Sequence, residues 1–438
     1  MIFLRQLLAH RGGVESKSSY ISSAQNFHHS PHCNVYTQSY LSWLYLFPLI
    51  ITPFSPFYAY IVCVFIMVGL SATINTHYRI LLSLTLVFNI AVIYSSRLYF
   101  NIATDFDDDF SRYYQNYLDI YDNISGAMFV WGGGFEIGLP LFYKLLSLFL
   151  PKLIPQYLLF FTALGATSLF YIWCEYYGTK WVKPHQKAAL IAFACFIGIF
   201  LESLGLTRQC FASIFLLFGF FAHTKRFKIL FFACAIGFHL SSILIIVLFY
   251  TLYYFPKLSL CIALTFFVVF VGDSIFTNSL LRELAPFLDI FLPSKLASYF
   301  TYYVSAHGYD PLTLKYIPII KVILMCCVIF CLFIITPHDK LTYKYKTLIL
   351  VSFGIYMTNI VPHRIVSLVC IMCFYFIVFV ILRRFYKLAL LFFFPYFLKL
   401  CFNYLTSSDN PQTQALELFH SFDIAHFYPF YYFLQGGF

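Results

Sequence analysis

The sequence has few charged residues, and this scarcity limits the kind of protein it can encode. Asp, Glu, Lys and Arg make up 11% of the 438 residues, against about 25% in a typical soluble domain. Hydrophobic residues make up 61%, and Phe alone occupies 56 positions. A soluble protein cannot bury this much apolar surface, because single cores stop growing at about 250–300 residues. We therefore predict an all-α, polytopic integral membrane helix bundle, since helices satisfy their own backbone hydrogen bonds in lipid.

The sequence also lacks the motifs of nucleotide-binding and nucleic-acid-binding proteins. Neither G-x-x-x-x-G-K nor G-x-G-x-x-G occurs in it. The formal net charge is +10, but the basic residues are scattered in short loops and form no stripe. Cys370 and Cys373 are spaced like metal ligands, yet they lie in an apolar run with no histidine or second cysteine pair nearby. We expect no nucleic-acid partner, no cofactor and no metal.

Long apolar runs predict about 12 membrane spans, within a range of roughly 11–14, because a helix needs about 20 apolar residues to cross the hydrocarbon. The runs lie between residues 41 and 405 and include 80–98 and 154–174. A polar segment over 1–40 is expected to be a disordered leader, and 406–438 forms a C-terminal tail.

Two further apolar runs are interrupted by proline or lysine. These runs, 40–51 and 135–150, contain Pro48 in the first case and Pro140 and Lys144 in the second. We read 40–51 as an extra span or an interfacial segment, and 135–150 as re-entrant or interfacial.

Basic loops indicate which side of the bundle faces the cytoplasm. Four loops carry three Lys or Arg each, and positive loops stay in the cytoplasm; they are 175–187, 223–228, 337–346 and 383–387. All four fall on one side only if the chain turns near His239, between two helices shorter than a normal span. The outer side then receives the long loops 99–153 and 277–315, the His239 turn and the tail.

Polar residues that could carry chemistry gather at this outer level: Arg97, Asp105, Asp108, Asp109, Tyr113, Tyr117, Glu136, Arg208, His239 and Arg364. Charges at membrane depth are costly and often mark a functional path. Arginine pairs with phosphate and stays charged when partly desolvated, and a histidine or carboxylate can take a proton from a hydroxyl. Structural explanations stay open for most of them: a helix-end anchor for Arg97, a solvated loop for the aspartates, and a satisfied structural histidine for His239.

Several of these residues lie in segments that resemble a known family. Thr207-Arg208-Gln209, the basic turn at Lys225-Arg226 and the segment Phe238-His239-Leu240-Ser241 resemble, in this order, the signature of the EpsG-like branch of Wzy polysaccharide polymerases. Upstream, Arg97 followed by Asp105, Tyr113 and Tyr117 resembles that family's first segment, and Glu136-Ile137-Gly138 through Lys144 resembles its second. The resemblance covers about residues 97–245. The C-terminal third is similar only in its hydropathy and in Arg364, and the polar leader and the run of aspartates depart from the pattern.

The resemblance implies a metal-independent enzyme that joins oligosaccharide repeat units, each carried on undecaprenyl pyrophosphate, into an O-antigen or capsule. The reaction would occur at the periplasmic face of a bacterial inner membrane, in a pathway that also has a flippase and a chain-length regulator as potential partners. The implied roles are a catalytic base at His239, with Glu136, Asp105, Asp108 or Asp109 as the second choice, and substrate binding by Arg97, Arg208, Gln209, Arg364, Tyr113 and Tyr117.

Two other functions remain open. A multi-spanning glycosyltransferase that uses a lipid-phosphate-sugar donor would also need arginines and an acidic outer loop. A transporter of lipid-linked glycan or another solute is the alternative from a different class. It would carry charged residues through the middle of the membrane, whereas here they lie mostly at one level.

Overall fold

The computed structural model describes residues 34–95, 109–198 and 207–255. Every regular element in these ranges is a helix, and no strand occurs among them. The chain divides into two units, residues 1–43 and 44–438. Helix α2 (Asn34–Ile51) begins inside the predicted leader, whose remainder lies outside the described residues. The elements discussed below belong to the second unit.

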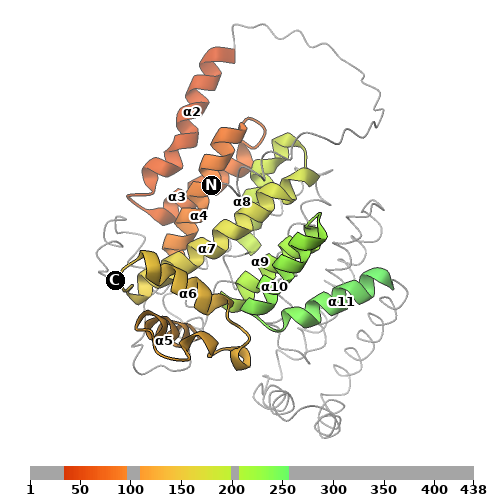
Figure 1. Cartoon of the computed structure of the whole chain (residues 1–438). Helices are drawn as coiled ribbons and strands as arrows, with labels where there is room; N and C mark the ends of the chain where they lie inside the picture. Colours follow the sequence, from red (N-terminus) through yellow and green to blue (C-terminus); the bar gives the residue numbers. More distant parts are fainter. Residues whose placement is uncertain (1–33, 96–108, 199–206, 256–438) are drawn as a thin grey trace, which may run out of the picture. The chain divides into compact units, whose positions relative to one another are not determined.

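Helices α3 (Pro56–Gly69), α4 (Thr76–Ser95) and α7 (Pro155–Tyr176) pack side by side (Figure 1). Prolines occupy the first position of α3 and α7, where a helix needs no N–H donor. Two segments, Thr76–Ser95 and Pro155–Lys180, are long and apolar enough to cross a membrane. The described region thus supports an all-helical protein with membrane-capable helices, while the predicted span count extends into residues outside it.

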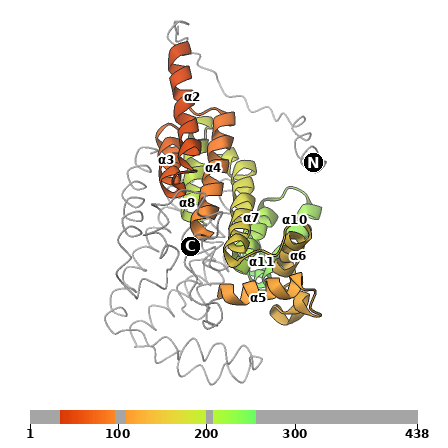
Figure 2. The same cartoon turned by 90° about the vertical axis from the view of Figure 1, so that its left-hand side faces the viewer.

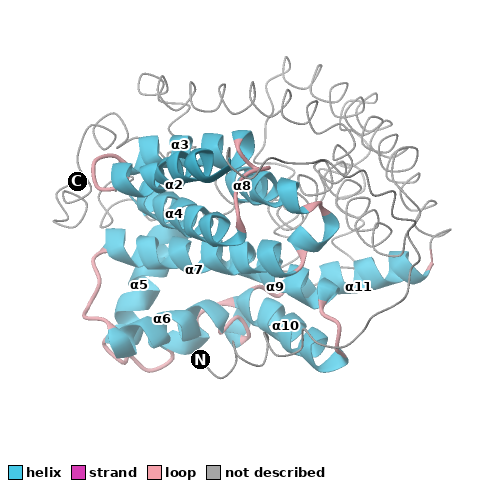
Figure 3. Cartoon of the chain, turned by 90° about the horizontal axis from the view of Figure 1, so that it is seen from above, coloured by secondary structure: helices cyan, strands magenta, loops and turns pink. Residues whose placement is uncertain are grey.

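Helices α8 (Lys187–Gly198), α9 (Thr207–Phe221), α10 (Lys225–Phe238) and α11 (Ser242–Tyr254) follow in the chain. The helix break predicted near His239 is confirmed, because α10 ends at Phe238 and α11 begins at Ser242. Helices α9 and α10 form a tight antiparallel hairpin (Figure 3). A Cβ atom on Gly219 would lie 2.4 Å from the Phe232 ring, so glycine permits this close approach.

The basic loops 175–187 and 223–228 lie at the same end of the described helices. Phe211, near the start of α9, packs beside Gly165, and Phe221, at its end, lies 5.6 Å from the Trp173 ring of α7. The two helices therefore run in parallel, and the ring of Tyr177 lies 6.1 Å from that of His223. This agrees with the prediction that both loops share one side of the membrane. The loops 337–346 and 383–387 lie outside the described residues.

The predicted outer loop 99–153 contains helical structure of its own in its described part, residues 109–153. Helix α5 (Asp109–Tyr121), the 3₁₀ turns η1 (Ala127–Phe129) and η2 (Gly132–Gly134), and α6 (Gly138–Phe149) pack together beside α10 (Figure 2). Pro140 falls in the first turn of α6, where it does not interrupt the helix. At 12 residues α6 is too short to cross a bilayer, and its interfacial or re-entrant position stays a prediction.

Candidate functional site

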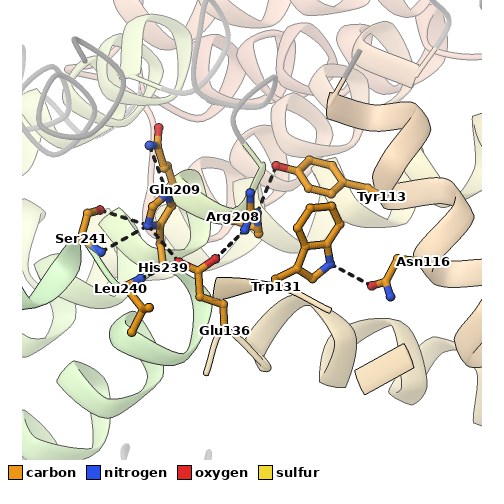
Figure 4. A network of polar contacts seen from close by, with 9 residues as sticks. All are labelled: Tyr113, Asn116, Trp131, Glu136, Arg208, Gln209, His239, Leu240 and Ser241. Carbon is orange, nitrogen blue, oxygen red and sulfur yellow. Dashed lines mark hydrogen bonds and ion pairs between the residues drawn. The ribbon is translucent and has the colours of Figure 1, made fainter. Parts of the chain in front are cut away.

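Arg208 lies at the start of α9 and points toward the segment that follows η2 (Figure 4). Its Nη1 lies 2.5 Å from Glu136 Oε2, and its Nε donates to the Tyr113 hydroxyl over 3.3 Å. The guanidinium carbon lies 4.3 Å from the centre of the Trp131 ring, within the range of a cation–π contact. The side chain is 20% exposed, so the cation is largely covered; it contacts the Glu136 carboxylate and lies over the rings of Trp131 and Tyr113.

Glu136 is the most buried charged group of the site, with 4% of its side chain exposed. While Oε2 faces Arg208, Oε1 accepts the backbone N–H of Leu240 over 2.8 Å and lies 3.3 Å from His239 Nδ1. A buried carboxylate is costly unless its oxygens are paired, and here both are. Glu136 therefore connects the start of α9 to the turn between α10 and α11.

Two glycines let the chain around Glu136 approach that turn. Gly132 has φ +57°, and a Cβ atom placed there would lie 2.4 Å from Glu136 Cγ. Gly138 lies against Phe238, where a Cβ atom would be 2.6 Å from the ring and 2.9 Å from the backbone nitrogen. We attribute both glycines to this contact, because any side chain at either position would displace Glu136 or Phe238.

His239 caps the C-terminus of α10 in an extended conformation and lies outside both flanking helices. Its Nε2 is 3.3 Å from Gln209 Nε2, and its Nδ1 is 3.1 Å from Ser241 Oγ. The ring is 20% exposed. Burial lowers the pKa of His239; the Glu136 carboxylate opposes this effect and Arg208 adds to it. The ring is therefore neutral near pH 7, the form that can accept a proton.

Trp131 and Asn116 support the site and were not predicted from the sequence. The Trp131 indole N–H donates to Asn116 Oδ1 over 3.1 Å, and Asn116 Nδ2 donates to the Ala127 carbonyl over 2.8 Å. This chain of hydrogen bonds fixes the position of the Trp131 ring beside Arg208. A tryptophan directly before three glycines was the available signal, since binding and catalytic residues lie disproportionately often on loops.

The structure brings Arg208, Gln209, Glu136, His239 and Tyr113 together. Their predicted roles stay predictions. Arg97, Asp105, Asp108 and Arg364 lie outside the described residues, and Asp109 forms the first residue of α5.

Tyr117 and Lys144 belong to segments of the same resemblance, but they lie away from the histidine. Tyr117 is fully buried, its hydroxyl accepts the Leu153 N–H over 2.9 Å, and its ring packs edge-on against Tyr143. Burial raises the pKa of Tyr117, so the phenol stays neutral. Lys144 donates to Asn123 Oδ1 over 2.6 Å. In this arrangement Tyr117 offers no open face to a sugar, and Lys144 stabilises the turn after α5.

Metal-ligating side chains do not gather anywhere in the described ranges. No group of three or more His, Cys, Asp or Glu residues lies close enough there to hold a metal ion.

Comparison with known proteins gives one match. The model of the EpsG family matches residues 86–419, which is most of the chain and includes the whole of this site. No curated protein and no solved structure matches.

Proposed function

Because this chain belongs to the EpsG family, we propose that it polymerises undecaprenyl-pyrophosphate-linked oligosaccharide repeat units into a surface polysaccharide. The family indicates a polysaccharide polymerase or a related glycosyltransferase-like enzyme in a membrane. The pyrophosphate-linked substrate, the transfer of whole repeat units and the periplasmic face of the inner membrane are the parts that we add.

One observation carries the proposal: a partly exposed arginine and a neutral histidine share a single buried carboxylate. Three separate segments supply Arg208, His239 and Glu136, and the first two each lie within hydrogen-bonding or ion-pairing distance of Glu136. Arginine binds phosphate oxygens in pairs and keeps its charge when partly desolvated. The cluster thus combines a group for the leaving pyrophosphate with a group for the attacking hydroxyl.

In the proposed reaction a sugar hydroxyl of one glycolipid attacks the anomeric carbon of the chain on another. The hydroxyl O–H bond breaks and its proton moves to His239 Nε2, while the new O–C bond forms. The bond between the anomeric carbon and pyrophosphate breaks, and undecaprenyl pyrophosphate leaves with the electron pair. Arg208 compensates the charge that develops on the leaving group, and base catalysis contributes roughly 10²–10⁴-fold.

Glu136 orients the other two groups in this scheme and does not itself take the proton, because both of its oxygens are engaged. Arg97 and Arg364 are proposed to reach the same pyrophosphate from the residues beyond the described ranges. Tyr113 holds the guanidinium through its hydroxyl.

The test is the replacement of Arg208 by alanine in cells that lack the native gene, followed by gel display of the surface glycan. We expect long polymer to disappear and single-unit glycolipid to remain, at a normal level of the protein. Arg79→Lys is the matched control, because Arg79 forms a separate ion pair with Glu175, near the C-terminal end of α7. An unchanged distribution of polymer lengths on the gel in Arg208→Ala would contradict the proposal. Loss of even the single unit would instead favour a glycosyltransferase with a lipid-phosphate-sugar donor or a transporter.

A further inference from the structure

Glu136 contacts both the arginine and the histidine, and we propose that it couples anion binding at Arg208 to the position of the hydrogen on the His239 ring. This inference rests on the proposed function, in which Arg208 holds the pyrophosphate and His239 is the base. Oε2 of Glu136 lies 2.5 Å from Arg208 Nη1, and Oε1 lies 3.3 Å from His239 Nδ1 (Figure 4). Because the carboxylate is 4% exposed, water does little to replace a partner that is lost.

The Nδ1 atom of His239 has two neighbours that require opposite positions of the ring hydrogen. The backbone N–H of Ser241 donates to Nδ1 over 3.3 Å, and this contact needs a lone pair on Nδ1. The Glu136 oxygen, at the same distance, needs a hydrogen on Nδ1. A neutral imidazole carries one ring hydrogen, so the first contact places it on Nε2 and the second leaves Nε2 as an acceptor. Only the second form can take a proton at Nε2.

Gln209 can serve either form of the ring. Its amide nitrogen lies 3.3 Å from His239 Nε2, which suits an Nε2 that accepts. Its Oε1 is buried and has no hydrogen-bond partner among the described residues. A half-turn about the last side-chain torsion, which has a broad minimum, would place Oε1 where it accepts a hydrogen from Nε2. The orphaned oxygen is therefore explained if the amide alternates between two orientations.

The partner of Arg208 decides between the two forms. While Arg208 compensates Glu136, the carboxylate attracts the Nδ1 hydrogen weakly, and the Ser241 contact keeps the hydrogen on Nε2. A diphosphate competes for the guanidinium through paired, charge-assisted contacts. Glu136 then carries a buried charge that needs a donor, and His239 Nδ1 is within reach. The ring, which is 20% exposed, releases its Nε2 proton to solvent and takes up a proton from solvent at Nδ1, so its charge is unchanged and the base is ready once the donor is bound.

Among the described residues, the ionisable groups that act on the ring are Glu136, which precedes α6, and Arg208 at the start of α9. Ser241, at the start of α11, contributes a hydroxyl 3.1 Å from Nδ1, and this hydroxyl can donate or accept. The Ser241 hydroxyl therefore favours neither form of the ring. The group that changes is the Glu136 carboxylate, which loses its contact with Arg208.

The experiment uses the full-length protein in lipid nanodiscs with ¹⁵N-labelled histidine and inorganic pyrophosphate as the probe. Nitrogen chemical shifts report which ring nitrogen carries hydrogen, and the His239 signal is assigned by its loss in His239→Gln. We expect the hydrogen on Nε2 without pyrophosphate and on Nδ1 at saturation. A His239 signal that does not respond to bound pyrophosphate would overturn the coupling.

Two variants sharpen this test. Glu136→Gln should still bind pyrophosphate but show no change in the His239 signal, whereas Arg208→Ala should show the Nδ1 form even without the anion. If Glu136→Gln does not accumulate, Arg208→Ala decides alone, and a hydrogen on Nε2 in that variant counts against the inference. Glu175→Gln, at the other arginine pair, should behave as the unmodified protein.

Polymer formation in cells separates this inference from the proposed function. Normal polymer in His239→Gln would remove the proposed function. Loss of polymer in His239→Gln, together with an unresponsive ring in the unmodified protein, would remove the coupling alone.

Discussion

Two arginine–glutamate pairs in the described part of the chain use the same two residue types in different ways. Arg79 on α4 makes two contacts with one partner, through Nη2 to Glu175 Oε1 and through Nε to Oε2 over 3.3 Å. Arg208 instead divides its contacts between Glu136, the Tyr113 hydroxyl and the face of Trp131. Glu136 in turn divides its oxygens between Arg208 and the His239 turn.

We use this difference to separate an ion pair that joins helices from one that we propose binds substrate. A fork-to-fork contact such as Arg79 with Glu175 satisfies both partners at once and joins α4 to the end of α7. In the second pair, Arg208 and Glu136 each keep further contacts with other residues. Those contacts can strengthen when the contact between Arg208 and Glu136 is lost. An exchangeable pair suits an anion site, whereas a closed pair suits helix packing.

The largest effect is expected from Arg208→Lys, compared with Arg79→Lys. A lysine keeps the charge but loses the planar set of donors, so we expect polymer formation to fall by about 10²–10³-fold, the usual cost of removing a transition-state donor. Arg79→Lys should stay within a few-fold of the unmodified protein. The measurement is the rate of polymer formation in membranes at matched protein level. Equal losses in both variants would contradict the distinction between the two ion pairs.

Gly138→Ala should come next, because the added Cβ lies 2.9 Å from the backbone nitrogen of Phe238, which cannot move aside as a flexible side chain can. We expect roughly a 10²-fold loss, the size expected when catalytic groups are displaced by about 1 Å. Gly237→Ala is the matched control, since a Cβ at Gly237 meets nothing within 4 Å. Assays of polymer formation for both variants test this, and equal activities would contradict the role given to Gly138.

The pH dependence of polymer formation should separate the two glutamates. His239 must be neutral to act as a base, and burial lowers its pKa below the ordinary value of about 6.5. Activity should therefore persist at pH values where an exposed histidine would already be protonated. Glu136 raises the pKa of His239, so in the residual activity of Glu136→Gln the acid limb should move to still lower pH.

Glu175→Gln is the control for this profile, and its acid limb should coincide with that of the unmodified protein. An acid limb that stays in place in Glu136→Gln would show that the carboxylate does not act on His239.

The smallest effect is expected at Trp131. Trp131→Phe keeps an aromatic face but loses the hydrogen bond to Asn116 and part of the cation–π attraction to Arg208, worth about 0.5–1 kcal/mol, or roughly two- to fivefold in affinity for the lipid-linked donor. Tyr176→Phe is the control at the second cation–π contact, where Lys180 lies over the Tyr176 ring at 4.4 Å. This change should not alter the affinity for the lipid-linked donor. Titration of donor substrate measures both, and a tenfold or larger effect of Tyr176→Phe would contradict the comparison.

Much of the helical framework could be predicted from apolar runs and loop charges. The run at 154–174 corresponds to α7 at Pro155–Tyr176, and the requirement that basic loops share one side located the helix break at His239. The sequence also indicated Arg208, Glu136 and His239, because charges beside apolar runs are costly and need a reason.

The contacts of the site could not be predicted in the same way. Nothing in the spacing of Trp131 and Asn116 connects them to Arg208, since their contacts depend on how α5, α6 and the α9–α10 hairpin pack. The surroundings of Tyr117 show the same limit. The resemblance implies a substrate-binding role for it, which stays a prediction, but it could not show that this side chain packs against Tyr143.

The α9–α10 hairpin has a consequence for relatives of this protein. Arg208 lies at the start of one arm and His239 at the end of the other, and the arms are pressed together at Gly219 and Phe232. One residue added within either arm would rotate its tip by about 100° and shift it by about 1.5 Å. Homologues should therefore conserve the exact number of residues that separates this arginine from this histidine.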